Sequence, residues 1–455
     1  MSMSIQKLLI ANRGEIALRI IRSAKKLNIK TVLACSESDI NSLPAKSADE
    51  VIVIGKSRAD DSYLDGKKII DAALQSGAQA IHPGYGFLSE NASFARAVLD
   101  AGLIFVGPSP QIIEQMGDKA IARDCAIKAG VPVVPGSNGE VISPEEALSV
   151  ASDITGYPLL IKASAGGGGK GIRIVHSPEQ LVHEYTVARA EAKAAFGHDG
   201  VYLERYIPEA RHVEVQILGD GKNIVHLFER ECSLQRKRQK VTEEAPSPSV
   251  SASLREALCQ SALNLARMLN YSSAGTIEYL VDDRSGEFFF IEMNTRIQVE
   301  HPVTEMVTGI DIIDWMLRIA GGDSLSFGQD EITLQGAAIE MRINAENPYN
   351  GFMPSPGTIS VLQIPEGQGI RVDTHMFEGY KMPLWYDSLL AKLIIHTDSR
   401  EKTISLARET LGNMQIEGVH TTIPLHEALL SAEFFRNAQF HNKTLEDWLN
   451  TGAFK

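Results

Sequence analysis

Short apolar segments alternate with amphipathic segments over the first ~110 residues of this chain. Apolar residues recur at helical spacing from Ile16 to Leu27, directly after the first apolar segment. Five segments read as buried strands: 7–11, 31–35, 51–55, 80–83 and 104–108. Strands that alternate with helices form a parallel sheet with helices on both faces. We therefore expect an α/β protein that begins with a doubly wound parallel-sheet domain. Its first turn carries only Gly14, so it lacks the dinucleotide-binding fingerprint.

The overall composition narrows the class of protein. The chain has 455 residues, enough for about three domains of ordinary size. Its net charge of -13 argues against nucleic-acid binding as the main function. The four cysteines form no CxxC pair, so neither a disulfide framework nor a structural zinc site is indicated. The apolar run from Leu8 to Ala11 is too short for a signal peptide, and no segment approaches the ~20 apolar residues of a membrane helix. We expect a cytoplasmic protein with no membrane partner.

The sequence KASAGGGGKG at 162–171 places four consecutive glycines between two segments that read as strands. A glycine run exposes backbone N–H groups without side chains and allows a phosphate to approach closely, although a flexible surface loop is the alternative. A Walker A loop is excluded because Ser164 stands where glycine is required and Gly171 where Ser or Thr is required. The remaining interpretation is a glycine-tipped hairpin that folds over nucleotide phosphates. An unpaired lysine in the apolar run LLIKA is costly, so Lys162 needs a negatively charged partner. We expect a nucleotide phosphate, whose charge Lys162 would neutralise.

A second informative segment, TIEYLVDDRSGEFFFIEMN at 276–294, reads as a β-hairpin with a DDRSG turn. Alternation puts Phe288, Phe290, Glu292 and Asn294 on one face, and a turn centred near Ser285 places Glu278 opposite Glu292. Two facing carboxylates repel unless a hard cation lies between them. Oxygen ligands suit Mg²⁺ or Mn²⁺, with nucleotide phosphates completing the shell, whereas two solvated carboxylates are the alternative.

Other polar residues alternate along neighbouring segments. Charged residues of both signs follow the hairpin, among them Arg296 and Glu300, and arginine can bind a planar anion while glutamate can act as a general base. His212, Glu214 and Gln216 share one face of HVEVQIL, and Glu340, Arg342 and Asn344 share one face of EMRIN. Each pattern alone fits a strand with a solvated face. Together with the two hairpins they indicate one polar cleft in an ATP- and Mg²⁺-dependent enzyme that phosphorylates or activates a small anion.

These motifs, in this order, resemble the biotin carboxylase family of the ATP-grasp superfamily, and the resemblance covers nearly the whole chain. The matching sequences are LLIANRGEIA at 8–17, IHPGYGFLSEN at 81–91, FVGPS at 105–109, GDK at 117–119, IKASAGGGGKG at 161–171, RHVEVQ at 211–216, QKVTEEAP at 239–246, IEMNTRIQVEHPVTE at 291–305, MRINAE at 341–346 and YDSLLAKL at 386–393.

The resemblance implies three domains. They are an N-terminal domain at 1–116, an ATP-grasp domain at 117–330 with a glycine-loop lid at about 134–206, and a C-terminal α+β domain at 331–455. It also implies a reaction in which ATP phosphorylates bicarbonate to carboxyphosphate, which delivers CO₂ to N1 of biotin. A closing lid would keep water away from this labile intermediate.

Site residues also follow from the resemblance. Lys240, Arg296, Val299 and Glu300 would bind bicarbonate, with Glu300 as its base. Arg342 would stabilise the enolate-like oxygen of biotin, and Tyr85 would lie near the biotin site. Glu278, Glu292 and Asn294 would carry two metal ions, Mg²⁺ or Mn²⁺. ATP would be bound by Lys119, Lys162, Gly168, Gly169, Glu204, Arg205, Tyr206, Ile207, His212, Gln235 and Arg238.

One position departs from the family pattern. The usual run QRRHQK reads QRKRQK here, so Arg238 replaces a histidine that normally contacts the nucleotide. Arginine can donate hydrogen bonds and stack on a base, but it cannot accept a bond as neutral histidine does. We expect activity to survive the change.

The resemblance also suggests partners. No Met-Lys-Met biotinylation motif occurs in the chain, so biotin should come from a separate carrier protein, with a carboxyltransferase acting downstream. A homodimer is expected. The biotin carboxylase subunit of acetyl-CoA carboxylase is the first hypothesis; a propionyl-CoA, pyruvate or urea carboxylase complex, or an ATP-grasp ligase with an amine acceptor, are the alternatives. A non-catalytic nucleotide sensor is disfavoured because Lys240, Arg296, Glu300 and Arg342 are all present.

Overall fold

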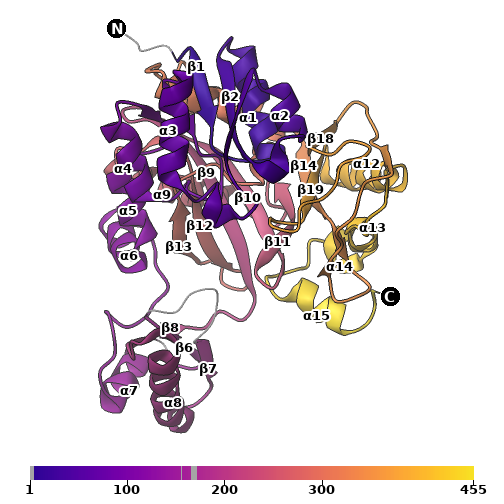
Figure 1. Cartoon of the computed structure of the whole chain (residues 1–455). Helices are drawn as coiled ribbons and strands as arrows, with labels where there is room; N and C mark the ends of the chain where they lie inside the picture. Colours follow the sequence, from indigo (N-terminus) through magenta and orange to yellow (C-terminus); the bar gives the residue numbers. More distant parts are fainter. Residues whose placement is uncertain (1–4, 155, 165–171, 455) are drawn as a thin grey trace.

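The computed structural model describes residues 5–154, 156–164 and 172–454 (Figure 1). A parallel five-stranded sheet opens the chain, in the order β3-β2-β1-β4-β5. Leu8 and Ile10 pack toward α1, whereas Leu9 packs with Ile69 on the opposite face. Helices therefore cover both faces, and the predicted doubly wound arrangement is confirmed. The elements are β1 (Lys7–Ile10), α1 (Gly14–Lys26), β2 (Lys30–Ser36), α2 (Leu43–Ser47), β3 (Glu50–Gly55), α3 (Gly66–Ser76), β4 (Ala80–His82), α4 (Ala92–Asp100), β5 (Ile104–Phe105) and α5 (Pro110–Gly117).

A small three-stranded unit follows, joined to the main body by two chain segments (Figure 1). Helix α6 (Lys119–Lys128) starts after Asp118 because that carboxylate caps the N–H groups of Ala120 and Ile121. The unit contains α7 (Pro144–Asp153), β6 (Leu159–Ala163), β7 (Ile172–Val175), α8 (Pro178–Phe196) and β8 (Val201–Arg205). Strands β6 and β7 pair antiparallel, so the two predicted strands are confirmed, while the glycines predicted to cover phosphates lie outside the described residues. The unit also has its own apolar core.

An eight-stranded antiparallel sheet forms the centre of the molecule, in the order β13-β12-β9-β10-β11-β14-β19-β18. One face packs on α9 through an apolar core, and the other face carries polar side chains. The sheet contains strands from both sides of the expected domain boundary at 330. Strand β11 pairs with β14, which places Glu243 opposite Glu340. The elements are β9 (Ala210–Asp220), β10 (Ile224–Arg236), β11 (Gln239–Ala245), α9 (Ala252–Met268), β12 (Ser272–Asp282), β13 (Phe288–Asn294), β14 (Ala337–Asn344), β18 (Ile370–Thr374) and β19 (Leu389–Thr397).

Helices and short strands complete the C-terminal part around a third core. The elements of this part are β15 (Glu346–Asn347), β16 (Met353–Pro354), β17 (Val361–Gln363), α12 (Arg400–Gly412), β20 (Gln415–Glu417), α13 (Ile423–Ser431), α14 (Glu433–Arg436) and α15 (Thr444–Asn450). Two further helices pack elsewhere: α10 (His301–Thr308) packs on the central sheet, and α11 (Ile312–Ala320) packs with α1. Among the described residues, no helix combines the length and the apolar character that crossing a bilayer requires.

Candidate active site

The hairpin β12–β13 brings two glutamates face to face. Glu278 and Glu292 are direct cross-strand partners, as predicted, and Asn294 pairs with Thr276. The predicted alternation along β13 is wrong at one point, because the register shifts between Glu278 and Tyr279. A bulge at the exposed Ile291 therefore turns Phe290 into the apolar core instead of onto the face of Glu292.

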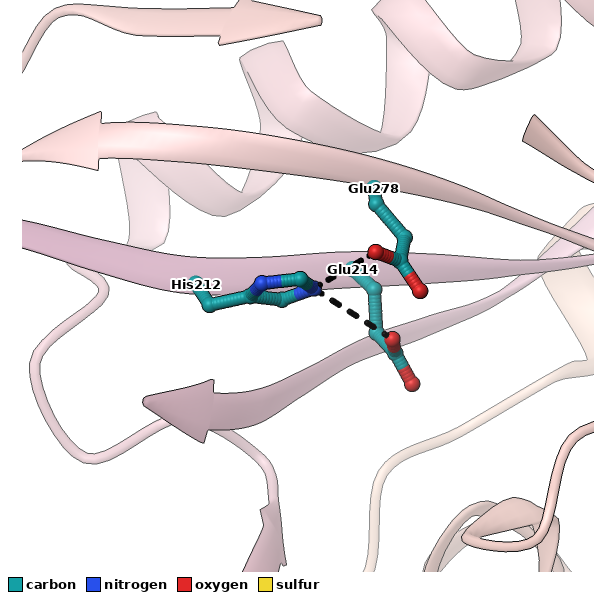
Figure 2. A group of neighbouring side chains, drawn as sticks. All are labelled: His212, Glu214 and Glu278. Atoms are coloured by element: carbon teal, nitrogen blue, oxygen red, sulfur yellow. Dashed lines mark ion pairs between the residues drawn. The ribbon is translucent and has the colours of Figure 1, made fainter. Parts of the chain in front are cut away.

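Glu278 is surrounded by donors, of which Figure 2 shows His212. Its Oε1 accepts hydrogen bonds from Asn294 Nδ2 and Gln298 Nε2, both at 2.8 Å, and from Lys240 Nζ at 3.1 Å. Its Oε2 forms an ion pair with His212 Nε2 at 2.8 Å. Burial alone would raise the pKa of Glu278, but the charges of Lys240 and His212 outweigh it and hold the pKa well below the ordinary value.

Glu292 has the opposite environment. No described residue forms a hydrogen bond or ion pair with its carboxylate, and burial, followed by the charge of Glu278, raises its pKa. A hard cation between the two carboxylates would relieve this repulsion, and Asn294 adds an amide oxygen close by. The residues present therefore fit the predicted metal group.

Lys240 lies at the centre of a carboxylate cluster. Its Nζ is 2.5 Å from Glu214 Oε2, 2.6 Å from Glu300 Oε1 and 3.1 Å from Glu278 Oε1. Although burial opposes it, the surrounding negative groups raise the pKa of Lys240 well above its ordinary value. Lys240 is thus a fixed cation, and it brings the predicted metal and bicarbonate residues together.

Glu300 is shared by two cations. Arg342 Nη2 lies 3.0 Å from Glu300 Oε2, while the Arg342 Nε donates to Glu243 at 2.7 Å. Burial would raise the pKa of Glu300, but Lys240 and Arg342 together lower it, so the carboxylate is ionised at neutral pH. Burial raises the pKa of Glu243 to about 7, although the charge of Arg342 acts to lower it.

Two supporting residues were not predicted from the sequence. Arg230 is completely buried and donates to Glu214 at 2.6 Å and to Gln298 at 2.9 Å. Its one signal was the charged run Glu229-Arg230-Glu231, which reads as a solvated segment. Glu90 accepts from Arg296 Nε at 2.8 Å, and Arg296 Nη2 donates to Asn294 Oδ1 at 2.8 Å. Nothing local in the sequence marks Glu90, because its partner lies 206 residues away.

Four of the residues expected around ATP form two separate pairs. Within the small unit Lys162 on β6 forms an ion pair with Glu204 on β8, so this lysine is paired, as its apolar run requires. Gln235 Nε2 lies 3.2 Å from His212 Nδ1, beside the Lys240 cluster. Among the described residues, no hydrogen bond or ion pair joins Lys162 or Glu204 to that cluster.

The other candidates lie outside these two pairs and have separate contacts. Lys119 is exposed at the start of α6, and Arg238 is exposed in the β10–β11 turn with a φ of 66°. Tyr85 Oη donates to Glu15, and half-buried Val299 precedes Glu300. Arg205 pairs with Glu287, Tyr206 contacts Lys443, and Ile207 packs on Val134 and Phe289, while Gly168 and Gly169 lie outside the described residues.

Comparison with known proteins agrees with this arrangement. Residues 4–113 match "Biotin carboxylase, N-terminal domain", residues 118–327 match "Carbamoyl-phosphate synthase L chain, ATP binding domain" and residues 340–447 match "Biotin carboxylase C-terminal domain". Biotin carboxylase 1 of Bacillus subtilis is 48% identical over 445 residues, covering 98% of this chain and 99% of that protein. The chain belongs to the biotin carboxylase family. As a biotin carboxylase it is an ATP-dependent ligase.

Solved biotin carboxylases share the whole fold. The biotin carboxylase domain dimer of Hydrogenobacter thermophilus 2-oxoglutarate carboxylase, in complex with MgADP, ADP and bicarbonate, is 47% identical with a TM-score of 0.90, covering 99% of each chain. The biotin carboxylase subunit of a pyruvate carboxylase is 46% identical with a TM-score of 0.89, again covering 99% of each chain. These biotin carboxylases serve different final acceptors, so the fold alone does not identify the acceptor of this chain.

Proposed function

We propose that this biotin carboxylase uses ATP and bicarbonate to carboxylate biotin carried by a separate protein, as the subunit of an acetyl-CoA carboxylase. The observation that carries the reaction is the sharing of one carboxylate, Glu300, between Lys240 at 2.6 Å and Arg342 at 3.0 Å. A carboxylate base flanked by two fixed cations suits a small anionic substrate that must both bind and lose a proton.

ATP is the proposed phosphoryl donor, since the solved 2-oxoglutarate carboxylase domain contains MgADP and bicarbonate. Glu278, Glu292 and Asn294 would hold Mg²⁺ or Mn²⁺, which would neutralise phosphate charge when bound. Two metal sites are part of this proposal. The nucleotide would be bound by Lys119, Lys162, Gly168, Gly169, Glu204, Arg205, Tyr206, Ile207, His212, Gln235 and Arg238.

The chemistry follows from the placement of charge. Lys240, Arg296 and Val299 would hold bicarbonate while Glu300 accepts its proton. A bicarbonate oxygen would then bond to the γ-phosphorus as the bond to ADP breaks, giving carboxyphosphate. This breaks down to CO₂ and phosphate, the phosphate takes the N1 proton of biotin, and N1 bonds to CO₂. Arg342 would stabilise the negative oxygen of biotin, close to Tyr85.

The wider assembly is also proposed. A biotin carrier protein and a carboxyltransferase would complete the complex, and the enzyme would act as a homodimer in the cytoplasm, without nucleic-acid or membrane partners. A pyruvate or other acyl-CoA carboxylase is the second candidate, because the similar solved domains include a pyruvate carboxylase subunit. We also propose functional units at 1–116, 117–330, with the lid at about 134–206, and 331–455.

Oxygen labelling tests the carboxyphosphate step. If bicarbonate carrying ¹⁸O is supplied with Mg²⁺-ATP and biotin, one labelled oxygen should appear in each inorganic phosphate that accompanies ADP. Unlabelled phosphate would mean that water attacks ATP and would contradict the mechanism. Acetyl-CoA, propionyl-CoA and pyruvate, each offered with the cognate carrier and carboxyltransferase, would then distinguish the acceptors.

A further inference from the structure

A fully buried lysine lies beside the site without a role in the proposed reaction. Lys392 on β19 is directly opposite Arg342 on β14 and Asp373 on β18, so the three side chains share one face of the central sheet. Its side chain is 0% exposed. Burying a charged lysine is costly unless its partners recover that energy, so this position is held by specific contacts.

The contacts of Lys392 join all three matched regions of the chain. Its Nζ donates to the carbonyl oxygen of Val299 at 2.9 Å and lies 3.2 Å from Glu15 Oε1. Glu15 comes from α1, and the same oxygen accepts from Tyr85. Asp373 lies farther away, at 3.9 Å.

Val299 belongs to the segment between β13 and α10 that contains the proposed bicarbonate residues. Two other hydrogen bonds also hold this segment in place. Arg296 donates to Glu90 at 2.8 Å, and Arg230 donates to Gln298 at 2.9 Å. Lys392 donates a hydrogen bond to the peptide carbonyl immediately before Glu300. A shift there would move the Glu300 carboxylate relative to Lys240, and errors of about 1 Å in such a site cost on the order of 100-fold in rate.

We propose that Lys392 is a positioning residue. It fixes the Val299–Glu300 peptide for bicarbonate binding and, through Glu15, holds the Tyr85 hydroxyl in place. The proposal rests on the proposed function. It assigns to Lys392 a task beyond balancing the charge of Glu15, and that distinction can be measured.

Two variants separate charge balance from positioning. Lys392→Met removes the hydrogen bond to Val299 and leaves Glu15 buried without its cation, so we expect a lower melting temperature and a KM for bicarbonate raised about tenfold or more. The double variant E15Q/K392M also removes the carboxylate charge. We expect it to regain most of the melting temperature while the bicarbonate KM stays raised about tenfold and the ATP KM stays within about threefold. Lys402→Met, an exposed lysine paired with Asp398, is the matched control.

A wild-type bicarbonate KM in the double variant would overturn the proposal, because Lys392 would then only balance charge. If neither methionine variant folds, Lys392→Arg provides the test: it keeps the charge but moves the donor, and an unchanged bicarbonate KM would overturn the proposal.

Hydrogen–deuterium exchange of residues 295–300 gives a readout that needs no activity. Exchange should be faster in the double variant than in the wild type, and equal exchange would contradict the proposal. If the wild type shows no bicarbonate-dependent ADP release, the proposed function fails, whereas the exchange experiment still tests the role of Lys392.

Discussion

Glu278 on β12 lies directly opposite Glu292 on β13, yet only Glu278 is surrounded by hydrogen-bond donors. The pair therefore has one carboxylate stabilised by Lys240 and His212, and one whose pKa is raised by burial and by the charge of its neighbour. This asymmetry leaves Glu292 available for a cation.

Replacing Glu292 should stabilise the protein without metal and weaken its response to metal. Glu292→Gln removes one of two facing charges, so we expect the metal-free protein to gain about 0.5–1 kcal/mol. The melting-temperature increase caused by Mg²⁺ with ATP should shrink at the same time. Glu256→Gln, an exposed change on α9, is the control. An undiminished Mg²⁺-ATP response in Glu292→Gln would argue against the metal assignment.

Replacing Lys240 should damage both fold and activity. Lys240→Met leaves Glu214, Glu278 and Glu300 without their shared cation, so we expect a loss of about 3–5 kcal/mol in stability. Bicarbonate-dependent ADP release should fall at least about 100-fold. Lys240→Arg keeps the charge and should recover stability better than activity; denaturant unfolding and ADP assays measure the two effects. Full activity in the methionine variant would contradict the account.

Arg342 should matter for the biotin step more than for ATP cleavage. Arg342→Lys keeps a cation near Glu300, but a lysine cannot bridge Glu243 and Glu300 as the guanidinium does. We expect bicarbonate-dependent ADP release to stay within about tenfold, while stimulation by biotin falls about 100-fold or more. Equal losses in both activities would place Arg342 in the bicarbonate site instead.

Arg238 tests the departure from the family pattern. Its side chain is exposed and forms no hydrogen bond or ion pair within the described part of the chain, so Arg238→His should change stability by less than about 0.5 kcal/mol. Both proteins should bind ATP in isothermal titration, with dissociation constants within about tenfold of each other. Failure of the wild type to bind ATP, together with binding by the histidine variant, would show that Arg238 blocks the site.

His426 should make stability depend on pH. Its Nε2 lies 2.8 Å from the carbonyl oxygen of Arg342, and burial lowers its pKa from 6.5 to about 4. Between these values the unfolded chain binds a proton that the folded protein does not, so stability should fall as the pH falls from 6.5 to 4. In His426→Gln this fall should be shallower by up to about 1.4 kcal/mol per pH unit, as measured by denaturant titrations. Equal slopes would contradict the assignment.

The sequence was sufficient to predict those parts of the structure that follow from a local pattern of residues. Alternating strand and helix segments indicated the doubly wound parallel sheet, and the turn near Ser285 indicated the pairing of Glu278 with Glu292. The bulge at Ile291 was not predictable, because FFFIEMN is apolar at nearly every position and shows no preferred face.

The long-range contacts could not be predicted. Lys392 and Val299 are 93 residues apart, and Arg342 and Glu243 are 99 apart. The charged residues of β10 and β14 read equally well as a solvated face, since only pairing across the full sheet and coverage by α10 bury them. The pairing of β11 with β14 likewise has no local signal.

The most direct test of the account is the half-reaction itself. Purified protein is supplied with Mg²⁺-ATP and ¹⁴C-bicarbonate, with and without free biotin, and both ADP and labelled carboxybiotin are measured. The account predicts bicarbonate-dependent ADP release that biotin stimulates, with label recovered in carboxybiotin. ADP release that biotin does not change, with no labelled carboxybiotin, would contradict the proposed biotin carboxylase activity.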